Sequence, residues 1–453
     1  MGHLHGLRES SASTIITRGA SGPILQHPVS LALRLGLLMR RPLLFIGVGG
    51  GMIDPNPSLP WTKARPLARR VLLLVGSLLA GNVVAQSVLG VLTVRAGRPL
   101  DFVAPAAAAR LLAAGSRCLY CAAPLFHAES VYLSTPSPKF FEFMNPPAAA
   151  VVLMPLAELP PVVGFSLFQV VSLAALGLGG WLLVSRCDCP PWVTMLGVLS
   201  LPAALGFAWG QWDALLFLAL TGALVLLERR PVLAGLLLSV LAIKVQAVWL
   251  VPVVLIAMRR WRLLRGVGLG ALAFVGSTLA ILGSHWAEWP AAVVQTSSSE
   301  LTGTVGLPAI VATYLGSEAG FLATAAGGAL SVLAIFRWRR PIGVEPALAI
   351  AAAVALSLLL APHSVPHDYL LAVPALALAS RGRLRAGVGA AVVLSGAVAL
   401  GASVLGLIAV VAFAFTQAVH SGYWLQRPIL QPRLNPGGFQ SQEVDAIGPP
   451  SVR

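Results

Sequence analysis

The feature that most constrains this chain is a series of long apolar segments that carry almost no charge. The first, VLLLVGSLLAGNVVAQSVLGVLTV at 71–94, contains no charged residue. Segments of about 20 apolar residues can cross a bilayer as helices, in which the backbone satisfies its own hydrogen bonds. They recur from Val71 to His420, and only 10% of the residues are charged, against roughly a quarter in soluble proteins. We therefore predict an all-α, polytopic membrane protein.

Short basic clusters between the apolar segments predict how the chain is oriented. Lys and Arg gather in the cytoplasmic loops of membrane proteins, and KARPLARR at 63–70 stands directly before the first segment. The segment 95–146 is then a long first extracytoplasmic loop, in which we expect a short helix on the membrane surface at 103–114. These clusters also account for the net charge of +15, so nucleic acid is not expected as a partner.

The rest of the apolar pattern predicts about ten to twelve transmembrane helices. The stretch 231–258 lies between two basic clusters, which favours an up-and-down pair of short helices with Lys244 near the outer turn. The run 146–161 is either a stubby span or a re-entrant segment. Further spans are expected at 162–184, 192–209, 213–228, 266–285, 317–336, 344–361, 368–380 and 387–418.

The two ends of the chain differ from this pattern. Residues 1–64 include polar and Gly/Pro-rich stretches, and we expect a cytoplasmic or disordered N-terminal tail. Residues 426–453 are Pro- and Gly-rich, which predicts a disordered C-terminal tail. We assign residues 65–425, between the two tails, to one transmembrane domain.

The four cysteines form two close pairs, Cys118/Cys121 and Cys187/Cys189. Four thiolates suit zinc, but the predicted topology puts the first pair outside and the second inside. A disulfide between Cys118 and Cys121 is one alternative, and unpaired small residues are the interpretation we favour.

Acidic residues are scarce, and most of those outside the tails fall on the predicted outer side. Asp101 stands out because it follows the first span by a few residues, with Arg95 and Arg98 nearby to keep it ionised. The sequence LDFV before an Ala-rich run also suits a helix N-cap. Asp101 is therefore either a cap, a solvated loop residue, or a carboxylate that faces a site.

Two further segments place ionisable groups in apolar surroundings, where they are costly and mark functional sites. Lys244 either snorkels to the interface or binds an anionic head group such as a phosphate. His363, His367 and Asp368 lie in a Pro-flanked break between apolar runs. The H-x3-H spacing would suit a metal in a helix, but Pro366 argues against a regular turn. Histidines that hydrogen-bond a ligand are preferred, with a plain polar turn as the alternative.

Several short motifs, in order, resemble glycosyltransferase family 87. They are an acid after the first span followed by Ala109, Leu111, Leu112, Gly115, Leu119 and Tyr120, then NPPAAAVVLMPLAELP, GQWD, AGLLLSVLAIKVQAVWLVPVVL and HDYLLAVPAL. The resemblance covers roughly 70–425. Asn145 replaces the usual Tyr before the Pro pair, and Asp213 stands where Asn is common.

The resemblance implies a GT-C-type membrane enzyme. Such an enzyme transfers a sugar, here mannose or arabinofuranose, from a polyprenyl phosphate to a hydroxyl of a lipid-linked or cell-envelope glycan, with inversion. The reaction takes place on the extracytoplasmic side of the cell membrane, with membrane lipids as surroundings. Asp101 would be the general base, His367 a second catalytic residue and Lys244 the partner of the departing phosphate. Other expected substrate-binding residues are Gln211, Asp213, Tyr120, His363 and Tyr369.

No cofactor and no metal are expected, because the predicted site has few acids to hold a metal. The sequence also lacks a P-loop, a dinucleotide-binding glycine motif and HExxH. A multispanning transporter or lipid flippase is the main alternative to a transferase, since it would share the helices and the buried lysine. A non-catalytic scaffold is a third.

Overall fold

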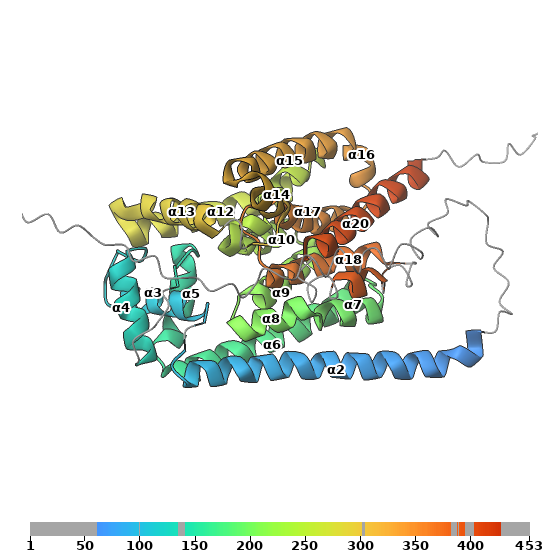
Figure 1. Ribbon diagram of the computed structural model, residues 1–453. Coiled ribbons are helices and arrows are strands. Elements are labelled where there is room, and N and C mark those ends of the chain that lie inside the picture. The colour runs from blue at the N-terminus through green and yellow to red at the C-terminus, as the bar shows by residue number, and fades with distance from the viewer. Residues whose placement is uncertain are drawn as a thin grey trace, which may run out of the picture. The chain divides into compact units, whose positions relative to one another are not determined.

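The computed structural model describes residues 61–98, 100–134, 141–300, 304–381, 387, 389–394 and 403–426. No strand occurs in these parts of the chain, which confirms the all-α prediction. Most of both predicted tails, and the middle of the predicted span 387–418, lie outside the described residues. The longer helices (Figure 1) are α2 (Trp61–Arg95), α3 (Val103–Ala113), α4 (Ala122–Leu133), α5 (Pro147–Ala157), α6 (Pro161–Arg186), α7 (Pro191–Val198), α8 (Leu201–Trp209), α9 (Asp213–Leu226), α10 (Pro231–Val240), α11 (Val251–Ala257), α12 (Trp261–Leu282), α13 (Glu288–Glu300), α14 (Leu307–Leu315), α15 (Ser317–Arg337), α17 (Pro346–Leu360), α18 (Val373–Ala379) and α20 (Ser403–Gln426). Shorter elements are η2 (Leu241–Ala247), η3 (Gly283–Ala287), α16 (Arg339–Ile342) and η5 (Pro366–Ala372).

Within the described residues, five helical stretches are long and apolar enough to cross a membrane. Six further apolar helices are shorter, with 10–17 residues. These lengths confirm a multi-pass membrane protein, while the total of ten to twelve spans stays a prediction. The five long stretches are 70–95, 161–186, 191–209, 261–295 and 317–337.

The first span, α2, shows how these helices divide their faces between protein and lipid. Leu74 and Leu78 are 61% and 65% exposed, whereas Val83 and Val94 are buried. The buried face contacts α6, α7 and α8, and α2 runs beside α6 and α8 in Figure 1. A helix with large exposed apolar side chains on one face suits a lipid environment, because lipid removes the cost of exposing them to water.

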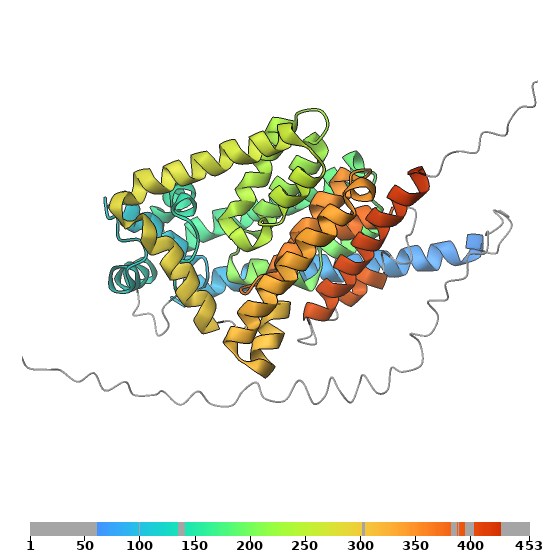
Figure 2. The ribbon, with the colours of Figure 1, turned by 90° about the horizontal axis from the view of Figure 1, so that it is seen from above.

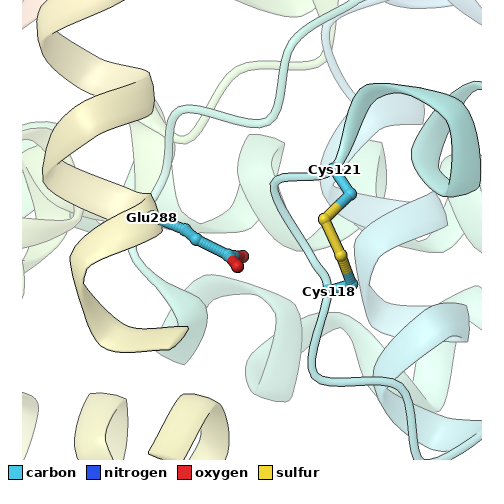
Figure 3. Close-up of side chains that lie close together, drawn as sticks. All are labelled: Cys118, Cys121 and Glu288. Atoms are coloured by element: carbon cyan, nitrogen blue, oxygen red, sulfur yellow. A yellow bond between two sulfur atoms is a disulfide. The ribbon is translucent and has the colours of Figure 1, made fainter. Parts of the chain in front are cut away.

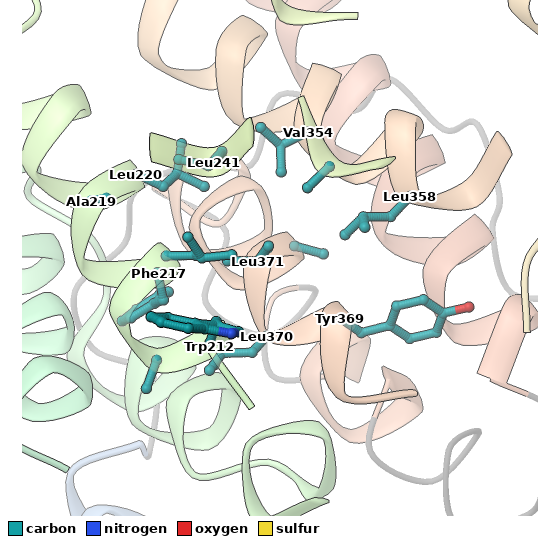
Figure 4. Close-up of a cluster of buried hydrophobic side chains, with 14 of the residues drawn as sticks. Trp212, Phe217, Ala219, Leu220, Leu241, Val354, Leu358, Tyr369, Leu370 and Leu371 are labelled. Carbon is teal, nitrogen blue, oxygen red and sulfur yellow. The ribbon is translucent and has the colours of Figure 1, made fainter. Parts of the chain in front are cut away.

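The best buried part of the chain is the layer formed by α17, η5 and α18. Most residues of α17 and all residues of α18 are buried, and both helices contact α20. Figure 4 shows Leu370 and Leu371 of η5 meeting Phe217 and Leu220 of α9, with the indole of Trp212 beside them. This apolar packing holds η5 in place against α8 and α9.

The stretch 231–258 is broken in its middle, as the sequence predicted. The helix α10 gives way to η2, where Lys244 has the non-helical angles φ −121° and ψ 85°, and α11 begins a few residues later. At the two ends, Arg260 donates to Glu228 at 2.9 Å. This ion pair places both basic clusters on the same side, which confirms the predicted up-and-down pair.

The predicted outer loop 95–146 contains α3 and α4, and α3 packs against α4 and against α5 from the following run 146–161 to form a small helical layer. The Ala-rich helix α3 forms as predicted, but its residues 103–109 are all buried against α4 and α5 rather than exposed on a surface. A run of alanines permits this close packing because it presents no bulky side chain. The helix begins at Val103 with Phe102 at the N-cap position and no side-chain cap hydrogen bond, so Asp101 does not occupy the N-cap that was one of its three alternatives.

Cys118 and Cys121 form a disulfide between α3 and α4, which corrects our preference for unpaired cysteines. Figure 3 shows the disulfide facing Glu288, which is the first residue of α13. In Figure 2, α12 and α13 leave η3 in different directions, and this brings the start of α13 to the outer loop. Cys187 and Cys189 are buried and unpaired, so the four cysteines do not form one zinc site.

Candidate active site

A cavity of about 1070 Å³ is lined by residues of the outer loop 95–146 and of η2, where the stretch 231–258 is broken. Its polar lining comes from the start of the loop, from the turn between α8 and α9, from η2 and from the segment before η5. Small and mostly apolar residues also line the cavity, with Thr324, Ala325, Gly328 and Ala329 from α15 and Val293 from α13. Ligand pockets of about 300–1000 Å³ hold drug-sized molecules, so this cavity has room for a sugar and part of an apolar chain.

Asp101 lines the cavity and is held by Gln211, whose Nε2 donates to Asp101 Oδ2. The two segments are also joined by a backbone hydrogen bond from Phe102 N–H to Trp209 O at 3.3 Å. Two residues predicted from separate motifs thus meet at one edge of the cavity.

Gly210 makes this meeting possible. It ends α8 with φ +70°, a conformation that L side chains rarely adopt. A Cβ on this residue would lie 2.5 Å from Phe165 and 2.8 Å from Phe102 Cβ. The glycine of GQWD therefore lets α8 turn sharply next to the Asp101 segment.

Lys244 lies between two buried carboxylates instead of pointing to the membrane interface. Its Nζ donates to Asp213 Oδ1 at 2.8 Å and to Asp368 Oδ1, and the lysine and both acids are at most 5% exposed. The N–H of Val365 donates to the other oxygen of Asp368 at 3.0 Å. Three elements, α9, η2 and η5, are joined by this cluster, which is too deeply buried for simple snorkelling.

His367 and His363 both line the cavity next to this cluster. His367 Nε2 is 3.9 Å from Asp213 Oδ2 and 3.9 Å from Asp368 Oδ1, beyond hydrogen-bond distance. Burial, together with the charge of Lys244, lowers the pKa of His367 to about 3, so its imidazole is neutral at pH 7. A neutral imidazole offers one donor and one acceptor to a ligand.

The two predicted tyrosines hold the site from outside the cavity lining. The Tyr120 hydroxyl donates to Asn145 O at 2.8 Å, and its ring stacks on Phe143 with the centroids 5.3 Å apart. Asn145, which does line the cavity, donates from Nδ2 to Ile243 O at 3.4 Å. Tyr369 points away and donates to Val305 O at 2.7 Å.

Sequence reasoning did not select several residues that the structure places at the site. Asp368 was noted in its motif but not as a partner of Lys244. A buried lysine needs opposite charge, and the few acids at apolar segment ends were the signal that could have identified both partners. The others line the cavity: Glu142, Asn145, Gln246 and Trp249.

The helices and the site together describe a multi-pass membrane protein with a large cavity, lined by both polar and apolar residues, beside buried charges. The model of glycosyltransferase family 87 matches residues 143–362. This match confirms the resemblance seen in the motifs and identifies the chain as a glycosyltransferase. No curated protein and no solved structure matches the chain. Lys244, Gln211 and Asp213 lie inside the matched residues, whereas Asp101, Tyr120 and the 363–369 segment lie outside them.

Proposed function

We propose that this glycosyltransferase takes its sugar from a polyprenyl phosphate and transfers it to a hydroxyl of a glycolipid or envelope glycan on the extracytoplasmic side of the cell membrane. The observation that carries the proposal is a cavity whose lining combines charged and polar side chains with small apolar ones. The polar side chains suit a sugar phosphate, and the small apolar residues from α15 suit an isoprenoid chain. A nucleotide sugar has no apolar chain to place there. Mannose and arabinofuranose are the sugars that the family resemblance favours.

Two features support a site on the outer side. The disulfide between Cys118 and Cys121 belongs to the same loop layer as Asp101, and disulfides persist in oxidising compartments. The basic residues 63–70 precede the apolar stretch 70–95, whose 26 helical residues extend about 39 Å. Asp101 follows the other end of that helix, away from the basic cluster that marks the cytoplasm.

The chemistry follows from one carboxylate at the edge of the cavity. The acceptor hydroxyl attacks the anomeric carbon and passes its proton to Asp101 while the bond from that carbon to the phosphate oxygen breaks. The configuration at the anomeric carbon inverts, and polyprenyl phosphate leaves. Gln211 fixes the orientation of the Asp101 carboxylate, which is the condition for efficient proton transfer.

The other predicted residues receive roles that fit their positions. Lys244 gives two of its three N–H groups to Asp213 and Asp368 and directs the third to the phosphate. His363 and His367 hydrogen-bond the phosphate or the sugar. Tyr120 positions Asn145, and Tyr369 anchors η5, so neither tyrosine touches the substrate in this proposal.

Reconstitution separates a transferase from the transporter or flippase alternative. Proteoliposomes would receive radiolabelled polyprenyl-phosphate mannose or arabinofuranose together with glycolipid acceptors, and the lipid products would be resolved by chromatography. We expect a new labelled glycolipid that requires both the acceptor and the protein. Movement of the labelled lipid between leaflets without any new product would favour a flippase and overturn the proposal.

A further inference from the structure

Acidic side chains outnumber basic ones in and directly behind the described lining of the cavity. The charged side chains among the described residues of its lining are Asp101, Glu142 and Lys244. Directly behind the lining, Asp213 and Asp368 neutralise Lys244. Counted over these described residues alone, the four carboxylates and one ammonium sum to a formal charge of −3 at pH 7. A departing phosphate gains negative charge here, and like charges in a poorly solvated cavity repel strongly.

Two buried polar atoms next to the lysine cluster are left without a hydrogen bond in the described structure. They are Asp213 Oδ2 and His367 Nε2, on residues that are 1% and 6% exposed. Burying a polar atom without a hydrogen-bond partner costs free energy. The other carboxylate oxygen of Asp213, Oδ1, accepts a hydrogen bond from Lys244. The His367 side chain lines the cavity.

The distance between these atoms suits a shared metal ion. Asp213 Oδ2, His367 Nε2 and Asp368 Oδ1 all lie within 4.8 Å of one another. The first two are 3.9 Å apart, so an ion between them would lie about 2.0–2.3 Å from each, within the usual range for a divalent cation. Asp368 is a weaker ligand, since Lys244 and the N–H of Val365 occupy its two oxygens.

We propose that Asp213 and His367 bind a divalent cation on the cavity wall, and that oxygens of the donor's phosphate and water complete its coordination. This replaces our expectation of a site without metal. The cation offsets the acidic lining and stabilises the charge that develops on the departing phosphate. One imidazole nitrogen with oxygen ligands suits Mn²⁺, Mg²⁺ or Zn²⁺. The role in catalysis rests on the proposed function, but binding of the cation does not.

Binding of Mn²⁺ tests the site without any sugar donor. Purified protein, with its disulfide intact, would be stripped with a chelator and titrated with Mn²⁺ while the free ion is followed by electron paramagnetic resonance. We expect one Mn²⁺ per chain and at least tenfold weaker binding in His367→Gln and Asp213→Asn. His363→Gln is the matched control, because His363 lines the same cavity outside the cluster; its Mn²⁺ affinity should equal that of the unchanged protein.

The design separates the possible failures. His367→Gln keeps the pairing of Lys244 with both acids, so it reports on the ion even where Asp213→Asn fails to fold. No stoichiometric Mn²⁺ binding, or equal binding in His367→Gln, would overturn the cation site. Sugar transfer that continues in excess chelator would overturn the catalytic role of the cation. It would leave the proposed reaction in place.

Discussion

Replacing Asp101 by asparagine should lower the rate of sugar transfer by about a thousandfold, because general-base catalysis contributes on the order of 10²–10⁴. Asparagine has nearly the same shape and still accepts a hydrogen bond from Gln211, so the loop should keep its conformation. It cannot take up the proton of the acceptor hydroxyl. The effect should therefore appear in the rate of transfer at saturating donor and acceptor, with donor binding unchanged.

Glu142→Gln is the matched control for this prediction. Glu142 lines the same cavity and is also a carboxylate, but it lies near the end of the loop 95–146, whereas Asp101 lies near its start. We expect its replacement to change the transfer rate by less than tenfold. A fully active Asp101→Asn variant, or a larger loss in Glu142→Gln, would show that Asp101 is not the base.

Replacing Lys244 by methionine is expected to destabilise the folded protein by about 3–5 kcal/mol. The change leaves Asp213 and Asp368 buried without the ammonium that neutralises them. Because α9, η2 and η5 meet at this cluster, the loss should affect the whole cavity. The measurement is the midpoint of thermal unfolding in detergent, followed by size-exclusion chromatography.

A compensated variant separates stability from function. Lys244→Met combined with Asp213→Asn and Asp368→Asn removes all three charges, so most of the lost thermal stability should return. Transfer activity should not return, because the variant lacks the third N–H group that Lys244 directs to the donor phosphate in the proposed mechanism. If Lys244→Met unfolds at the same temperature as the unchanged protein, the buried ion pairs do not have the structural role assigned to them.

Much of the architecture was accessible from the sequence because helix length, charge placement and breaks obey simple constraints in a membrane. The uncharged run 71–94 became the span within α2, and the basic clusters around 231–258 correctly predicted a pair of helices broken at Lys244. The contact of Arg260 with Glu228 has the same origin, since both ends of the pair lie on one side.

The partners of the charged residues were less accessible, because they come from distant parts of the chain. Lys244 is 124 residues from Asp368, and no local pattern reports that contact. The same is true of Asp101 and Gln211, which are 110 residues apart. Asp101 and Lys244 were selected for their unusual settings, but their partners depend on how the helices pack.

Burial in the outer loop was also beyond local reasoning. Glu129 lies in the predicted outer loop 95–146, yet in α4 it is 0% exposed. Burial raises the pKa of Glu129 to about 7, and the N–H of Phe141 donates to its Oε2 at 3.4 Å. The alanines of α3 are likewise buried, because a run of small residues suits tight packing as well as a surface.

A comparison of two donors tests the proposal that the sugar is carried on a lipid monophosphate. Purified protein would be given the same radiolabelled sugar on a polyprenyl phosphate and on a nucleotide, each with the same glycolipid acceptor. We predict a labelled product from the polyprenyl phosphate alone, because only that donor has an apolar chain to place against the small residues of α15 that line the cavity. Transfer from the nucleotide sugar at a comparable rate would contradict the proposed donor.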